Sequence, residues 1–149
     1  MVRSIRLRSM RIFIATILAA SLTTGVGRLV YADSATGSQD PHLTVYASIT
    51  PDCLMPGGVR TRFASVTNNT NKAAHVKLGW VLAYNGVVYY TATPRDVTMP
   101  PKQTWVLQNL IGSDYPAEGL GTYTETRSAT DGAGTSSATT TYTFASSCP

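Results

Sequence analysis

Large apolar side chains recur at every second position between Val76 and Tyr84, and Asn85-Gly86 follows directly. A period of two is typical of a β-strand with one buried face. Asn-Gly favours a type I′ turn, because both central residues of that turn adopt positive φ angles. We therefore predict a central hairpin over residues 76–90, in which a two-residue loop pairs Leu82 with Tyr89.

Five further segments have strand-like patterns and are separated by turn residues. They cover residues 43–49, 59–67, 103–111, 122–130 and 135–144. In 59–67 the predicted inward set is Val59, Thr61 and Phe63. Ala64 and Val66 fall on the other parity, which indicates a β-bulge. Prolines at 94, 100 and 101 restrict residues 94–102 to an edge strand or a crossover. No stretch has a clear helical period, so the sequence predicts an all-β, antiparallel sandwich of about seven strands.

The N-terminal 32 residues have the three-part plan of a secretory signal peptide. Arginines precede the apolar run 12–22, which is shorter than the roughly 20 residues that a membrane-spanning helix needs. Small residues at positions 30 and 32 predict cleavage before Asp33, while a cut after Ala20 and an uncleaved signal anchor stay open. We assign 1–32 to the signal, 33–41 to a flexible lead-in and 42–149 to one domain. The mature chain, with no second hydrophobic run, is expected to lack a transmembrane segment and to be secreted or to lie at a bacterial cell surface.

Export changes the meaning of the charge. The chain has 12 Lys and Arg residues against 8 Asp and Glu residues, a formal charge of +4. Five of the basic residues and none of the acidic ones precede Asp33, so the rest of the chain has seven basic and eight acidic residues. This balance argues against nucleic-acid binding, which requires a basic surface.

The two cysteines, Cys53 and Cys148, lie near the ends of the predicted domain. In an oxidising compartment an even number of cysteines in a small domain indicates a disulfide, with two free thiols as the alternative. The cysteines are too far apart in sequence for a redox pair or for a typical metal-binding spacing.

The sequence has little that points to catalysis. His42 and His75 are the two histidines, and we expect no carboxylate to orient either imidazole. No nucleophile elbow, metal-ligand spacing or phosphate-binding glycine loop is present, and Asp131-Gly132 is typical of a turn. Asn68-Asn69-Thr70 matches a glycosylation sequon, which we interpret as a loop. We therefore expect no enzymatic activity, no cofactor and no metal.

Two short motifs resemble parts of known extracellular modules. One runs from Gly121-Thr122-Tyr123 through the turn 129–134 to Tyr142-Thr143-Phe144, and the other is Val66-Thr67-Asn68 with Thr70. They are similar to the last hairpin and the second strand of bacterial immunoglobulin-like or fibronectin-III-like domains. The resemblance implies an immunoglobulin-like sandwich whose first and last strands run parallel, which would bring Cys53 near Cys148.

The resemblance also draws attention to Glu125 and Arg127, because those families usually have apolar residues there. The pair shares a strand face with Tyr123. Burying two charges costs several kcal/mol each before pairing, so we favour a solvated face, with a ligand-binding polar patch as the alternative.

Hydroxyl and aromatic side chains supply the other candidate binding surfaces. Thr122, Thr124 and Thr126 begin a row on the opposite face of the same strand, next to a second row at 139, 141 and 143. Tyr46 is predicted to point outward, and Tyr90 to lie on the face opposite Trp80. Trp80 and Trp105 are predicted core residues, one from each sheet.

These features favour a secreted, non-catalytic extracellular or cell-surface module that binds a protein or a polysaccharide. The alternative is a secreted inhibitor that presents a rigid loop, 112–121 or 94–102, to an extracellular enzyme. A small secreted hydrolase is the least favoured class.

Overall fold

The computed structural model describes residues 42–149, so the predicted signal peptide and lead-in lie outside the described residues. This part of the chain contains nine β-strands and no helix. The strands are β1 (Leu43–Thr50), β2 (Cys53–Leu54), β3 (Val59–Asn68), β4 (Ala74–Tyr84), β5 (Val87–Thr91), β6 (Arg95–Met99), β7 (Thr104–Ser113), β8 (Gly121–Thr130) and β9 (Thr135–Phe144). The all-β prediction is confirmed, and the two strands beyond the expected seven are the short β2 and β6.

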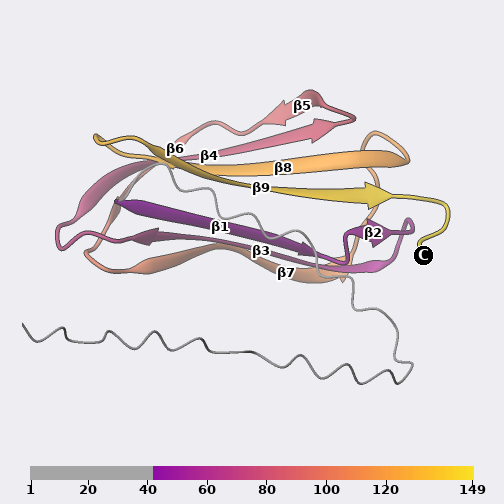
Figure 1. Ribbon diagram of the computed structural model, residues 1–149, viewed down its shortest axis with the longest axis horizontal. Helices are drawn as coiled ribbons and strands as arrows, with labels where there is room; N and C mark the ends of the chain where they lie inside the picture. The colour runs from indigo at the N-terminus through magenta and orange to yellow at the C-terminus, as the bar shows by residue number, and fades with distance from the viewer. Residues whose placement is uncertain (1–41) are drawn as a thin grey trace, which may run out of the picture.

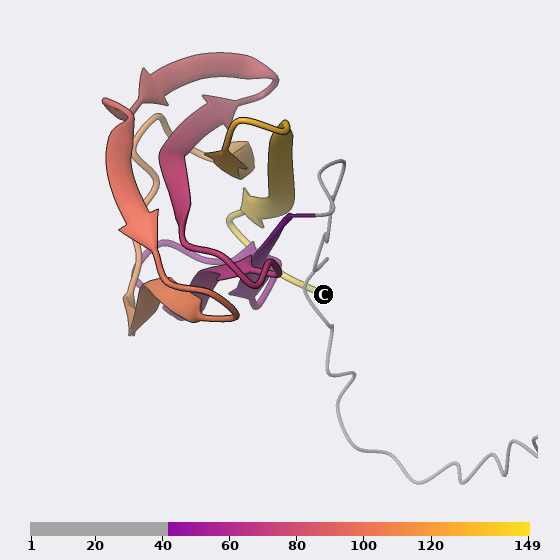
Figure 2. The same cartoon turned by 90° about the vertical axis from the view of Figure 1, so that its left-hand side faces the viewer.

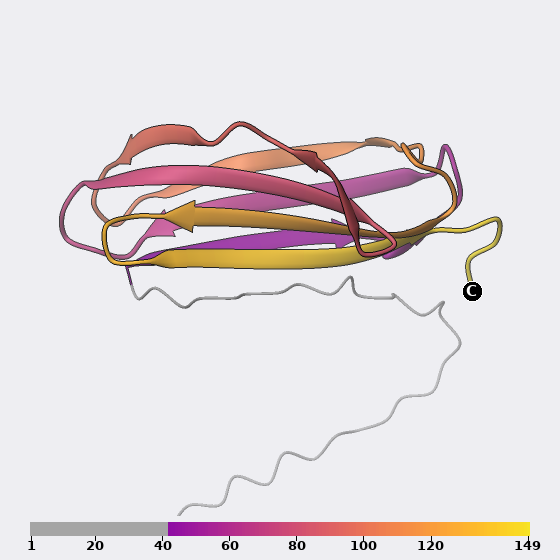
Figure 3. The same ribbon diagram turned by 90° about the horizontal axis from the view of Figure 1, so that it is seen from above.

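The strands form two sheets that lie face to face (Figure 1). One sheet has the order β1-β3-β7, and the other has the order β2-β9-β8-β4-β5, with β6 also paired to β4. Figure 3 shows β5 and β6 along one side of β4, where each pairs with a different half of that strand. The predicted edge position of residues 94–102 is therefore confirmed for β6. Figure 2 shows β6 at the side of the molecule, between the two layers.

The predicted faces of β1 are confirmed. Leu43, Val45, Ala47 and Ile49 are each at most 2% exposed. Burying a Val, Leu or Ile side chain contributes about 1.5–3 kcal/mol, so this strand supplies a large part of the core. Its first three buried residues join one apolar cluster with β3, β4 and β9, and Ile49 joins a second cluster with aromatic residues of β8 and β9.

The inward set predicted for β3 is wrong. Val59 is 61% exposed, whereas Arg60, Ala64 and Val66 are buried. The predicted bulge is confirmed, since the register with β7 shifts between Ala64 and Ser65. The arginines of β3 contact acidic and aromatic side chains inside the molecule. Hydropathy along the strand does not predict that such charged residues are buried.

The hairpin of β4 and β5 forms at Asn85-Gly86, with φ angles of 46° and 82°. Its predicted register is wrong beyond the first two pairs. A shift between Leu82 and Ala83 pairs Leu82 with Tyr90 instead of Tyr89. Tyr90 consequently lies on the same face as Trp80.

The disulfide between Cys53 and Cys148 is confirmed, with 5.7 Å between the Cα atoms. The short strand β2 runs parallel to β9 and brings the two ends of the domain together. Between His42 and Pro149 there is no helix long and apolar enough to cross a membrane.

Candidate functional site

Glu125 and Arg127 lie inside the molecule, which corrects the prediction that their strand face is solvated. They are 2% and 8% exposed, on the same inward face of β8 as Tyr123 and Ala129. Arg127 Nε donates a hydrogen bond to Glu125 Oε1 at 2.8 Å, and its Nη2 donates one to Gln108 Oε1 at 2.5 Å. The charges are paired, which is the condition under which burial is tolerated.

The polar interior continues from Glu125 toward β3. Arg62 Nη1 lies 3.9 Å from Glu125 Oε2, and Arg62 Nη2 donates a hydrogen bond to Asp114. Arg60 Nη1 lies 3.0 Å from the same Asp114 oxygen. We call the five residues Arg60, Arg62, Asp114, Glu125 and Arg127 the ionic row. It joins β3, β8 and the end of β7 across the two sheets.

Aromatic rings enclose both ends of the ionic row. The Arg60 guanidinium lies 4.0 Å from the centre of the Tyr142 ring and 4.7 Å from that of Phe144. The Arg127 guanidinium lies 4.0 Å from the centre of the Trp80 ring. Desolvated cation–π contacts of this kind contribute about 2 kcal/mol each, which offsets part of the cost of burying the arginines.

Burial shifts the proton affinities of this region. It lowers the pKa of Arg60, with partial compensation by Asp114. Burial by itself would lower the pKa of Arg62, but Tyr142 and Asp114 outweigh it and raise that pKa. Burial also raises the pKa of Tyr142 to about 12, although the two arginines act in the opposite direction. Both arginines therefore stay charged at neutral pH, and Tyr142 stays neutral.

Four members of the ionic row, Arg60, Arg62, Asp114 and Arg127, line a groove between the open edges of the two sheets. Three hollows of about 200, 440 and 280 Å³ follow one another there. The first two share Trp80, Leu107 and Arg127, and the second and third share Leu110. We call them together the edge groove; its lining includes Trp80, Arg95, Leu107, Gln108, Leu110, Arg60, Arg62 and Arg127.

Tyr90 contacts Trp80, which lines this groove. Its ring meets that of Trp80 edge to face, with centroids 5.3 Å apart, and it is 43% exposed. Trp80 Nε1 and Glu125 Oε2 are buried and have no hydrogen-bond partner within residues 42–149. A buried donor and a buried acceptor without partners each cost about 1–3 kcal/mol, so both gain if a polar ligand reaches them.

The predicted hydroxyl rows also exist, on the outer face of the six-stranded sheet. Thr122, Thr124 and Thr126 of β8 stand opposite Thr143, Thr141 and Thr139 of β9. Thr126 and Thr139 share a hydrogen bond of 2.9 Å. We call these two rows the hydroxyl face. None of these six threonines lines one of the three hollows of the edge groove.

Tyr46 lies on the outer side of the three-stranded sheet, half-buried, with its ring centroid 5.9 Å from that of Phe63. Of the predicted binding residues, Arg127 lines the edge groove, Glu125 is buried and accepts a hydrogen bond from Arg127, and Tyr90 contacts the lining residue Trp80. Tyr46 and the threonines face away from the groove, on the outer sides of opposite sheets.

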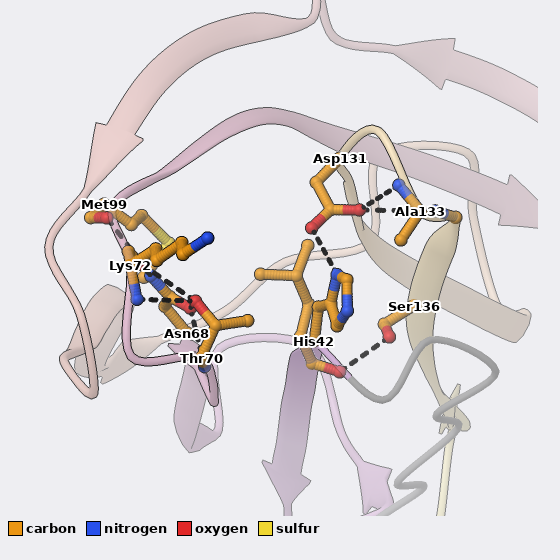
Figure 4. A network of polar contacts seen from close by, with 10 residues as sticks. His42, Asn68, Thr70, Lys72, Met99, Asp131, Ala133 and Ser136 are labelled. Carbon is orange, nitrogen blue, oxygen red and sulfur yellow. Dashed lines mark hydrogen bonds and ion pairs between the residues drawn. The ribbon is translucent and has the colours of Figure 1, made fainter.

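One end of the molecule has a second polar cluster, shown in Figure 4. Contrary to the sequence prediction, a carboxylate does face His42: Asp131 Oδ2 lies 3.4 Å from its Nδ1. Ser136, nearby, is fully buried and donates a hydrogen bond to the Leu43 carbonyl, so it is not placed as a nucleophile. Asp131 also accepts hydrogen bonds from the Ala133 and Gly134 amides, as expected of a turn.

The loop after β3 belongs to the same end. Asn68 is fully buried, and its side-chain nitrogen lies within hydrogen-bond distance of the Lys72, Met99 and Pro100 carbonyls. Its side-chain oxygen accepts a hydrogen bond from Thr70. The amide that matches a glycosylation sequon therefore fastens a loop. A hollow of about 700 Å³ lies here, bounded by His42, Thr70 and His75, among others, but the described residues contain no group of three or more metal-ligating side chains.

Sequence reasoning missed Arg60, Arg62 and Asp114 as parts of a site. The available signal was the pair of arginines at alternate positions of an otherwise uncharged strand, as Glu125 and Arg127 are in theirs. No protein-family model matches this sequence, and a search of the curated proteins returns no significant match.

Proposed function

We propose that the protein is a secreted, non-catalytic extracellular or cell-surface module whose edge groove binds a polysaccharide. The observation that carries the proposal is the groove itself, where Trp80 lines two adjoining hollows, contacts the exposed ring of Tyr90, and has a buried Nε1 without a partner within residues 42–149. Sugar rings present apolar faces that suit aromatic rings and hydroxyl groups that both donate and accept hydrogen bonds. A sugar hydroxyl at Trp80 Nε1 would satisfy a donor that the folded chain leaves unpaired.

An immunoglobulin-like fold is part of this proposal. The order β1-β3-β7, facing β9-β8-β4, corresponds to the two sheets of immunoglobulin-like sandwiches. Tyr123 Oη donates a hydrogen bond of 2.8 Å to the Gly119 carbonyl, as the tyrosine corner of such domains does. In antibody domains the second cysteine follows this tyrosine by two positions, where the present chain has Glu125. The ion pair of Glu125 with Arg62 would then replace the inter-sheet disulfide.

Binding of a protein is the second candidate, and the edge strand β7 favours it. β7 pairs with β3 along one side, and its ten residues contain neither a charged residue nor a proline. Such an unprotected edge is suited to accept an added strand from another chain. Val106 and Ile111, exposed by 58% and 74%, would pack against that strand.

The inhibitor alternative keeps one of its two loops. Residues 94–102 contain β6, so they do not form a free loop. Residues 114–120 do, and Tyr84 Oη holds this loop through a 2.8 Å hydrogen bond to the Leu120 carbonyl. Tyr115 in this loop is 70% exposed and would be the contact residue for an enzyme.

Affinity electrophoresis through gels containing soluble polysaccharides tests the proposal. The expected result is retardation by at least one polysaccharide, weakened at least about tenfold by Tyr90→Ala, which removes a groove aromatic. Tyr46→Ala is the matched control, because it removes a tyrosine from the outer side of the other sheet. Thr124→Lys blocks the hydroxyl face. Loss of binding in either of these variants, with Tyr90→Ala unaffected, would place the ligand elsewhere and contradict the proposal.

A further inference from the structure

The third hollow of the edge groove differs chemically from the other two. It has a volume of about 280 Å³ and is lined by Arg60, Arg62, Asp114 and the segment 110–113 of β7. Arg60 is 2% exposed and Arg62 is half-buried, so both guanidinium groups lie in a poorly solvated place. A charge is worth most where water screens it least.

The side-chain N–H groups of Arg60 are the candidate donors in this hollow. None of its three side-chain nitrogens has a hydrogen-bond partner within residues 42–149. Nη1 lies 3.0 Å from Asp114 Oδ2, but the contact lacks hydrogen-bond geometry. Tyr142 and Phe144 contact the guanidinium with their rings, and Arg60 lines the hollow, so an acceptor that enters the hollow would meet unsatisfied N–H groups. Guanidinium groups bind planar, charged oxygen groups through this edge.

The charges of the ionic row do not balance. Its ion pairs join three arginines to two carboxylates, so one positive charge is in excess. Asp114 is shared by Arg60 and Arg62. One singly charged anionic group in the hollow would complete the row, and burial would make that attraction strong.

We propose that the hollow at Arg60 and Arg62 binds a singly charged anionic group, a carboxylate or a sulfate ester, of an acidic polysaccharide that lies along the edge groove. This inference rests on the proposed function and narrows it to polymers that carry negative charges. The continuity of the hollow with the aromatic part of the groove, through Leu110, allows one chain to contact both.

Gly112 offers a variant that tests the hollow without removing a buried arginine. It pairs with Arg60 across β3 and β7 and lines the hollow, and a Cβ atom built there meets nothing within 4 Å. Gly112→Asp places a carboxylate of the protein beside Arg60, where it competes with the ligand. Gly132→Asp is the matched control, because Gly132 is equally unobstructed and lies in the β8–β9 turn, away from the hollow.

The experiment measures binding of polygalacturonate, alginate, fully methyl-esterified polygalacturonan, dextran sulfate and neutral dextran. We expect the wild-type protein to bind at least one acidic polymer ten times or more tightly than its uncharged counterpart. Gly112→Asp should abolish this difference, and Gly132→Asp should retain it. A preference for polyuronates identifies a carboxylate, and a preference for dextran sulfate over dextran identifies a sulfate ester. Equal binding of charged and uncharged polymers would overturn the anion site and leave the proposed function standing.

Small probes separate the two proposals further. Galacturonate and methyl sulfate, compared with galactose by NMR titration of the wild-type protein, should shift amide signals of residues 110–114 and leave the Gly132 turn unchanged. If these anions bind but no polysaccharide does, the anion site holds and the proposed function fails. If neither a small anion nor an acidic polymer binds more tightly than its uncharged match, the anion site is overturned. Binding of poly-glutamate but of no polysaccharide would assign the groove to acidic proteins and contradict the proposal.

Discussion

At the residue scale, the molecule is distinguished by charged side chains that are buried between its two sheets. Glu125 is 2% exposed, and Arg127 and Arg62 both lie within ion-pair distance of it. Buried pairs of this kind rarely add net stability, but breaking one costs much because a charge is left without a counter-ion. The ionic row is therefore an energetically costly way to fill a core, and four of its members also line the edge groove.

Replacement of Glu125 tests the coupling within the row. We expect Glu125→Leu to lower the free energy of unfolding by about 3–5 kcal/mol, because Arg127 loses its buried counter-ion. The double variant Glu125→Leu/Arg127→Leu should be less destabilised than the single one, since both charges are gone. Urea denaturation measures both values. If the double variant loses as much free energy of unfolding as Glu125→Leu and Arg127→Leu lose in sum, the two side chains are not coupled.

Tyr142, which contacts Arg60 of the ionic row, should make the stability of the protein depend on pH in the alkaline range. Its pKa is raised to about 12 by burial, against about 10 in an unfolded chain. The protonated tyrosine therefore favours the folded state, and this contribution is fully present below about pH 10 and is lost as the pH rises toward 12. The loss is of the order of 2 kcal/mol. Tyr142→Phe keeps the ring beside Arg60 and should flatten the decline of stability between pH 10 and 12, as measured by denaturation at each pH.

At the element scale, the hairpin of β4 and β5 is fastened to the start of β8. Asn85 N donates a hydrogen bond to the Thr122 carbonyl, and Asn85 Oδ1 accepts one from Thr122 N. The alternation in β4 and the Asn-Gly turn could be predicted from sequence because they depend on local chemistry. The shift that moves Tyr90 to the Trp80 face could not, because a bulge depends on how a strand packs against distant partners.

Gly121 marks a place where the hairpin and β8 approach closely. Its φ angle is 155°, and a Cβ atom there would lie 2.6 Å from Tyr84 Cε2. Gly121→Ala combines backbone strain with overpacking, so we expect a loss of about 2–4 kcal/mol in the free energy of unfolding. Gly132→Ala is the control, since a Cβ atom there contacts nothing and the change should be within about 0.5 kcal/mol. Similar effects of both substitutions in chemical denaturation would contradict the close approach.

At the scale of the whole molecule, apolar periodicity predicted the strands and one buried face of β1 correctly, because each depends on neighbours within a few residues. It failed for β3 and β8, where Arg62 and Glu125 meet across the two sheets although 63 positions separate them. A pattern of polar and apolar residues does not distinguish an exposed charged side chain from one that is buried in an ion pair. The edge groove could not be predicted for this reason, since buried arginines of β3 and β8 line it.

The disulfide acts on this same scale, because it closes almost the entire described chain into one loop. Cys53 and Cys148 are 95 positions apart, so the chain-entropy model gives a stabilisation of about 4–5 kcal/mol. β2 is two residues long, and its backbone contacts with β9 are few, which makes the bridge the principal tether of this corner. We expect Cys53→Ser/Cys148→Ser to lower the free energy of unfolding by that amount in urea denaturation. The native protein should also show no thiol that reacts with iodoacetamide before reduction, by mass spectrometry. A labelled cysteine in the native protein, or a double variant as stable as the wild type, would mean that β2 is held by its packing against β9 alone.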